Sequence, residues 1–176
     1  MQLNANIQID QYLADKIEAN DLNCVDCFKL AAAEHLAGLF PALPVYLVPQ
    51  QQTNPIRQLP PALFVQVFDL HREKRLGTRA EWALVVNVAY ISVDKNAESE
   101  QQDAAVRIMD AIEHIPPLEG MEYPYTIYSS DSKTVDGIVN ITGTLTVWER
   151  RTDDAPIIEV ADTNIYIKEG KTNGCS

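Results

Sequence analysis

The chain has 176 residues, of which 25 are Asp or Glu and 14 are Lys or Arg, so its formal net charge is −11. This length fits one domain with one hydrophobic core. The acidic balance favours solubility and disfavours binding to phosphate backbones, so sequence-specific recognition of nucleic acid is not expected.

The sequence also argues against membrane and secretory classes. No apolar run approaches the roughly 18–20 residues that cross a bilayer, and the first ten residues lack a basic patch followed by an apolar stretch. Three cysteines are an odd number and do not suggest a disulfide framework. We therefore expect a protein without membrane contact that is made in the cytoplasm.

The N-terminal third predicts helices. Residues 1–20 are expected to be an extension that contains one short helix, with Tyr12, Leu13 and Ile17 on its apolar side. A clearer helix is predicted from Leu22 to Leu39, because its apolar positions recur every three or four residues. Asp21 or Asn23 is a suitable N-cap, and Pro41 ends the helix. The predicted apolar stripe consists of Val25, Phe28, Ala32, Leu36 and Leu39.

The middle of the chain predicts strands. A short strand is expected at 44–48, followed by a long loop at 49–61 that is rich in proline and glutamine. Strands follow at 62–70 and 81–93. The second of these is apolar on both faces except at two positions, which is typical of a central strand. The charged segment 71–80 between them predicts a protruding β-hairpin.

The last part of the chain adds one helix and one strongly patterned strand. A helix is predicted over 97–115, with Ala105, Val106, Met109 and Ile112 on its apolar side. Residues 129–132 are interpreted as a polar loop. Residues 139–147 alternate strictly between apolar and polar side chains, so one face of this strand packs and the other meets water or a partner. A final strand is predicted within 157–167.

This order of elements predicts an α+β fold, with an antiparallel or mixed β-sheet and two main helices packed on one face. Residues 21–168 are expected to form the single domain, and residues 169–176 a flexible tail.

One motif in the sequence could carry chemistry, the two cysteines of Cys24-Val-Asp-Cys27. A C-x-x-C pair at a helix start lowers a thiolate pKa, but the strand that precedes it in redox folds is not predicted here. A zinc site needs two further ligands, which are not found at suitable spacing. Neither a Gly-rich phosphate loop nor a nucleophile elbow occurs. We therefore expect no cofactor, no metal and no catalytic activity.

An ordered series of short segments between residues 24 and 168 resembles the phage tail-terminator family of tailed phages and phage-like particles. An amphipathic helix ends at a Phe-Pro pair, a Gln-containing loop ends in Pro-Ala-Leu-Phe-Val, and a basic turn leads to a long strand. A further helix and loop lead to Val-Asp-Gly-Ile before the last long strand. The segments are Phe40-Pro41, Val45-Tyr46, Pro61–Val65, Arg75, Arg79, Asn87–Tyr90 and Val135–Ile138. The chain departs from the family in its extra N-terminal segment and in Trp148, where Tyr is usual.

The resemblance implies a structural, non-enzymatic virion protein. In this family a small α+β subunit forms a homohexameric ring that ends the tail tube and joins it to the neck and head. The implied partners are other copies of the chain, tail-tube and neck proteins, and the sheath if the tail is contractile. The ring would be assembled in the bacterial cytoplasm and found in the virion.

Two other readings remain open at this stage. One is another neck or head–tail completion ring; the other, from a different class, is a cytosolic small-molecule-binding protein or enzyme with an unrecognised site. The residues expected at subunit interfaces come from the charged hairpin and from the polar face of the alternating strand. They are Arg72, Lys74, Arg75, Arg79, Thr142, Thr144 and Thr146.

Overall fold

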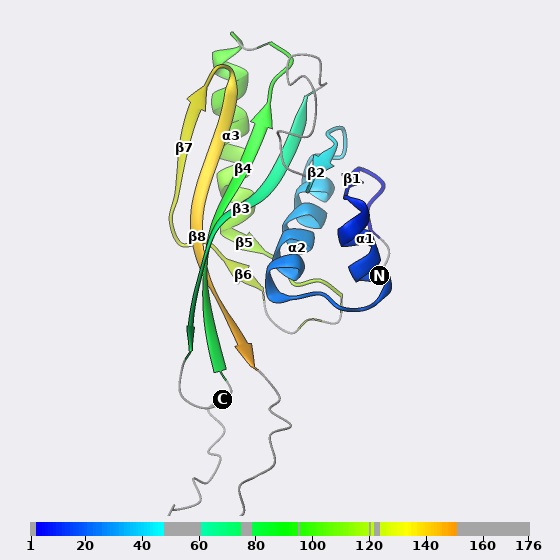
Figure 1. Cartoon of the computed structure of the whole chain (residues 1–176). Coiled ribbons are helices and arrows are strands. Elements are labelled where there is room, and N and C mark those ends of the chain that lie inside the picture. The colour runs from blue at the N-terminus through cyan, green and yellow to red at the C-terminus, as the bar shows by residue number, and fades with distance from the viewer. Residues whose placement is uncertain are drawn as a thin grey trace, which may run out of the picture.

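The computed structural model describes residues 3–47, 61–74, 79–94, 96–119, 121 and 124–150 (Figure 1). The loop predicted at 49–61 therefore falls almost wholly outside the described residues. Arg75, the strand predicted within 157–167 and the tail at 169–176 also lie outside them.

A six-stranded mixed sheet forms the centre of the molecule, in the order β1-β2-β3-β4-β8-β7. The pairs β1–β2 and β2–β3 are parallel, whereas β3–β4, β4–β8 and β8–β7 are antiparallel. The strands are β1 Ile7–Gln8, β2 Val45–Tyr46, β3 Ala62–Lys74, β4 Arg79–Ile91, β7 Ser130–Val135 and β8 Ile138–Arg150. A separate antiparallel pair is made by β5 His114–Ile115 and β6 Tyr125–Thr126.

The helices are α1 Gln11–Glu18, α2 Cys24–Leu39 and α3 Glu98–Glu113. Figure 1 shows α3 behind the upper part of the sheet and α2 beside α1. The main core lies between the sheet and the two long helices, and α2 contributes Phe28, Leu30 and Leu36, each fully buried. The strand residues of this core are Leu63, Val65, Leu84, Val86, Val88, Val139, Ile141 and Leu145. The predicted α+β fold, with two main helices on one face of a mixed sheet, is confirmed.

The opposite face of the sheet holds a second, smaller cluster. Ala62, Phe64, Ala89 and Ile91 are buried there, and the ring of Tyr46 stacks on that of Phe64 with centroids 5.0 Å apart. This cluster is confined to the end of the sheet where β3 begins. It explains why β4, the strand between β3 and β8, is apolar on both faces, as predicted for a central strand.

The start of α2 is fixed by local chemistry. The side chain of Asn23 accepts hydrogen bonds from the backbone N–H groups of Val25 and Asp26, and the Asp26 carboxylate accepts one from the N–H of Asn23. This capping box satisfies amides that have no partner inside the helix. Asp26 also pairs with Lys16 and so ties α1 to α2. Of the two predicted caps, the structure selects Asn23.

Residues 3–20, expected as an extension, contribute to the main body. Asp10 caps α1 through the backbone N–H of Leu13, at 2.8 Å. Ile7 and Leu13 are buried in the main core, and β1 adds a parallel strand next to β2.

The prediction of a polar loop at Ser129–Ser132 was wrong. Ser130–Val135 form β7, which pairs antiparallel with β8. The two strands are joined by Asp136 and Gly137, whose φ angles of 52° and 80° are those of a two-residue hairpin turn. Residues 131–135 of this edge strand are exposed, so β7 carries no apolar alternation by which it would be recognised.

Three residues assigned to the apolar sides of helices are exposed instead. Tyr12 is 71% exposed, Leu39 is 47% exposed and Val106 is 59% exposed. The buried positions of α3 include Ile108, Ala111 and Ile112. The α3 stripe is therefore narrower than the sequence pattern implied, because only one side of that helix meets the sheet.

Candidate functional site

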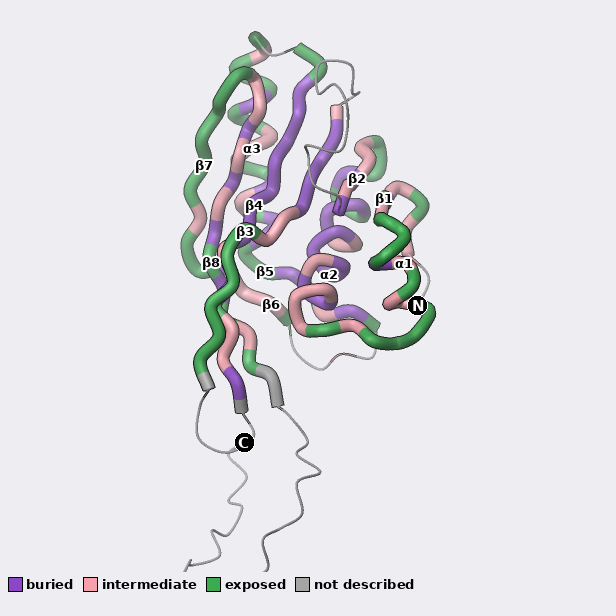
Figure 2. The backbone as a smooth tube through the Cα atoms, viewed as in Figure 1, coloured by how far each residue is buried: buried purple, intermediate pink, exposed green. Residues whose placement is uncertain are grey.

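The most prominent surface feature is the hairpin of β3 and β4. The two strands pair from Ala62↔Ile91 to Lys74↔Ala80, with one irregularity between Val67 and Asp69. Figures 1 and 2 show the paired strands extending beyond the helices, with largely exposed or partly exposed residues in the extended part. The protruding hairpin expected from the charged segment is therefore present.

Arg72 lies on the helix-side face of this hairpin. Its guanidinium sits over the ring of Trp82, 5.3 Å from the ring centroid, a cation–π contact. Trp82 is directly opposite Val147 in β8, and both pack against the main core. Lys74 and Arg79 occupy the ends of β3 and β4 next to the hairpin tip.

The predicted threonine row lies on the opposite face of the sheet. Thr144 and Thr146 are exposed and face outward beside Val85 and Ala83. Thr142 differs, since it is only partly exposed and its hydroxyl donates a hydrogen bond of 3.4 Å to the side-chain oxygen of Asn87. The open part of the row is therefore Thr144 and Thr146.

Asn87 was not among the predicted site residues, although its place in an apolar strand marked it as unusual. It is 2% exposed, and its side-chain N–H donates to the side-chain oxygen of Asn140 at 3.4 Å. Together with Thr142 this makes a short polar ladder across β4 and β8. Buried polar groups need such partners because an unsatisfied one destabilises the fold.

The structure does not bring the two sets of predicted interface residues together. Arg72 belongs to the face that carries the helices, whereas Thr144 and Thr146 belong to the other face. A subunit therefore presents two distinct candidate surfaces, the hairpin and the open sheet face.

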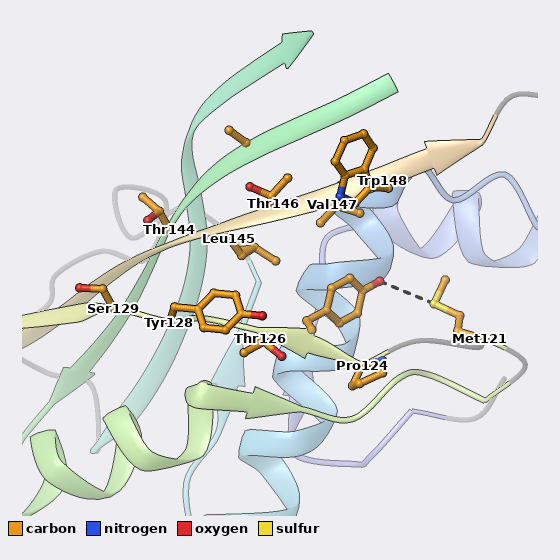
Figure 3. A pocket seen from close by; sticks show the side chains of 12 residues that line it. Met121, Pro124, Thr126, Tyr128, Ser129, Thr144, Leu145, Thr146, Val147 and Trp148 are labelled. Atoms are coloured by element: carbon orange, nitrogen blue, oxygen red, sulfur yellow. Dashed lines mark hydrogen bonds between the residues drawn. The ribbon is translucent and has the colours of Figure 1, made fainter. Parts of the chain in front are cut away.

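A groove runs beside the C-terminal half of β8, between that strand and residues 124–129 (Figure 3). Its volume is about 980 Å³, and none of the described residues that line it is charged. Tyr128 is 92% exposed and Trp148 is 59% exposed at this groove. Sequence reasoning missed it, because the two aromatic residues are distant in the chain and neither belongs to a motif.

The phenol of Tyr125 is held in its neutral form at this groove. The hydroxyl of Tyr125 donates to the sulfur of Met121 at 3.7 Å. Burial, with smaller contributions from Cys27 and Cys24, raises the pKa of Tyr125 to about 12. The phenol therefore stays protonated at pH 7 and acts as an apolar surface with one hydrogen-bond donor.

The two cysteines at the start of α2 are thiols rather than a disulfide. Cys27 is buried, and burial, followed by the charge of Asp26, raises its thiol pKa. A raised pKa lowers the thiolate fraction and hence reactivity. Burial likewise lowers the pKa of half-buried His35. Within the described parts of the chain, no three His, Cys, Asp or Glu side chains are grouped so as to hold a metal.

Comparison with known proteins gives one informative match. The family model described as phage tail terminator protein matches residues 28–157, well over half of the chain. No curated protein matches. A solved structure titled only with a sequence identifier is 16% identical, with a TM-score of 0.34, over 78% of this chain and 95% of that one. Among the described residues, no helix is long and apolar enough to cross a membrane.

Proposed function

The chain belongs to the phage tail terminator family and is a structural component of a phage tail, and from this premise we propose that it forms a homohexameric ring that ends the tail tube and joins it to the neck. The family match is the observation that carries the proposal. Residues 28–157 begin within α2 and extend past the end of β8 at Arg150, so the match includes most of α2, all of α3 and the long strands β3, β4 and β8 of the main core.

Ring closure requires two different surfaces on each subunit, because a cyclic assembly larger than a dimer joins unlike patches head to tail. The β3–β4 hairpin and the open face at Thr144 and Thr146 are two such patches. We propose that the hairpin of one subunit, with Arg72, Lys74, Arg75 and Arg79, contacts the sheet of the next.

The other proteins that the ring would contact follow from its position between the tail tube and the neck. One side would meet the last ring of the tail tube, and the other would meet a neck protein, with the sheath as a further partner in a contractile tail. The net charge of −11 per chain would repel DNA phosphates and let DNA pass without binding. The protein would be assembled in the bacterial cytoplasm and carried in the virion.

The test is native mass spectrometry of the purified chain, combined with electron microscopy of the same sample. A sixfold mass and ring-shaped particles support the proposal. A monomer that persists at tens of micromolar would contradict the hexamer. In particles assembled without the protein, tubes of uncontrolled length are expected, and tubes of normal length would contradict a terminating role.

A further inference from the structure

Beyond the helices, β3, β4 and β8 continue together as a three-stranded ribbon with two open edges (Figure 1). On one side, β2 pairs with β3 only up to Phe64. On the other side, β7 pairs with β8 only up to Gly143. Past these two residues, no described strand pairs with either outer edge of the ribbon. Each edge presents backbone N–H and C=O groups that are able to pair with a further strand.

The two open edges match in level and in direction. His71 in β3 and Thr146 in β8 are both directly opposite Ala83, on either side of β4. Both outer strands are antiparallel to β4, so they run in the same direction. Neighbouring copies in a ring are related by rotation about one axis and join unlike patches head to tail. The β3 edge of one copy can therefore meet the β8 edge of the next at a similar level, as a parallel pair.

The groove beside β8 suits the apolar side chains of the β3 edge. Phe68, at the irregularity in β3, is 64% exposed, and Leu70 is 50% exposed. Leu70 is at the level of Leu145, because both are directly opposite Leu84, and Leu145 lines the groove. Figure 3 shows Tyr128 across the groove from β8. A neighbouring β3 would cover these apolar side chains, which favours association.

The acidic residue of this part of β3 stays on the open face. Asp69 is directly opposite Val85 and at the level of Thr144, and both Asp69 and Thr144 are exposed. Successive side chains of a strand point to opposite faces. Asp69 would therefore keep its contact with water while Leu70 meets the neighbouring copy.

We propose that β3 of each copy, from Phe68 to Arg72, pairs as a parallel strand with residues 144–148 in β8 of the next copy. The pairing rests on the proposed ring and gives its contact a specific form, a sheet that continues from one subunit to the next. The partner of the open β8 edge is thus a second copy of this chain.

The test is a disulfide between copies, formed by His71→Cys and Thr146→Cys in the full chain, with Cys24 and Cys175 changed to Ser and Cys27 to Ala. Within one chain the two positions are two strand spacings apart, about 9.5 Å. A disulfide spans at most about 7 Å between Cα atoms, so any bond between them joins two copies. Oxidation with diamide should give a ladder of covalent oligomers up to the hexamer on a non-reducing gel.

Two companion variants locate the register. Asp69→Cys and Glu73→Cys, each combined with Thr146→Cys, move the first cysteine by two residues on the same face. The pair that links fastest identifies the register. If none of the three pairs links, the proposed pairing is wrong.

The matched control combines His71→Cys with Asp131→Cys. Asp131 is exposed and pairs with Thr142, so it shares the open face, but it lies on β7 and away from the open edge. This pair should link at least tenfold more slowly than the fastest of the three pairs. Equal rates would show random collision and would overturn the pairing.

Native mass spectrometry of the reduced protein separates this pairing from the proposed ring. A hexamer in which no pair links would leave the ring standing and contradict the pairing. Linking that stops at the dimer would also contradict it, because two equivalent contacts join only two copies. A ladder of linked copies without a closed hexamer would support the pairing and contradict the hexamer.

Hydrogen exchange tests the backbone contact without any substitution. The amides of residues 144–148 that point away from β4 should exchange at least tenfold more slowly in the assembled protein than in the dilute monomer. Equal exchange in both states would count against the pairing. Strong protection already present in the monomer would show that another part of the same chain covers this edge, and would also overturn it.

Discussion

At the scale of the residue, Gly143 shows how one position in β8 is fixed by its neighbours. A Cβ added there would lie 2.6 Å from Cγ2 of Ile127 and 3.2 Å from the carbonyl oxygen of Ser129. The segment that leads into β7 therefore packs directly on the glycine. Gly38, near the end of α2, is exposed, and a Cβ there would meet nothing within 4 Å.

These two glycines give opposite predictions for the same substitution. Gly143→Ala should lower the free energy of unfolding by about 1–3 kcal/mol through overpacking. Gly38→Ala should raise it by about 0.5–1 kcal/mol, because alanine favours the helix. Urea denaturation of both variants beside the parent measures the difference. A Gly143→Ala variant as stable as the parent would contradict the packing described at Gly143, and a destabilised Gly38→Ala variant would contradict the open space at Gly38.

Thr144 tests whether the open sheet face is an interface. Thr144→Lys should change the free energy of unfolding by less than about 0.5 kcal/mol, since the residue is exposed. It should nevertheless reduce the hexamer fraction, because the proposed contact would bury an unpaired charge. Thermal melting and native mass spectrometry report the two effects separately.

Thr134→Lys is the matched control for the positive charge introduced by Thr144→Lys. Thr134 is also an exposed strand residue, but it pairs with Val139 on the helix-side face of edge strand β7. The control variant should fold and assemble like the parent. If Thr144→Lys is also fully hexameric, the open face meets solvent, and if it unfolds, that face is part of the core.

At the scale of the element, the β3–β4 hairpin can be shortened without disturbing its base. Arg72 and Trp82 are directly opposite, so residues 73–81 can be replaced by Asn-Gly, which favours a two-residue hairpin turn. This change keeps the Arg72–Trp82 contact and removes Lys74, Arg75 and Arg79. We expect a folded subunit by circular dichroism and a loss of most hexamer in native mass spectra.

The control variant keeps the full length of the hairpin and removes only two of its positive charges. In the full-length hairpin, Lys74→Gln with Arg79→Gln should weaken the ring less than the deletion does, because backbone and apolar contacts remain. An intact ring in the shortened variant would assign the hairpin another role, such as contact with the tail tube.

At the scale of the whole molecule, charge is expected to oppose assembly. In the proposed hexamer, six copies that each carry −11 would repel one another, and salt would screen this repulsion over a Debye length of about 10 Å at 0.1 M. The hexamer fraction at a fixed protein concentration should therefore rise between 20 and 300 mM NaCl. Sedimentation velocity measures that fraction, and a fall with salt would show that specific ion pairs dominate the interface.

The sequence by itself determined the elements whose signals are local. Asp21 or Asn23 as a cap and Pro41 as a stop indicated the two ends of α2, and the structure decided for Asn23. The alternation of β8 identified its buried face, because side chains in a strand point to opposite sides in turn. The apolar run of β4 placed it in the centre of the sheet. The ordered series of short segments was sufficient to identify the phage tail terminator family.

Only the tertiary structure decided how distant segments meet. β7 is polar and exposed, so nothing in its own sequence marked it as the partner of β8. Asn87 is satisfied by Asn140 and Thr142, which lie 53 and 55 residues away. The split of Arg72 and Thr144 onto opposite faces, and the open edge beyond Gly143, follow from strand register. Local periodicity fixes which side of a strand is apolar, but register and neighbours depend on contacts between segments that are far apart in the chain.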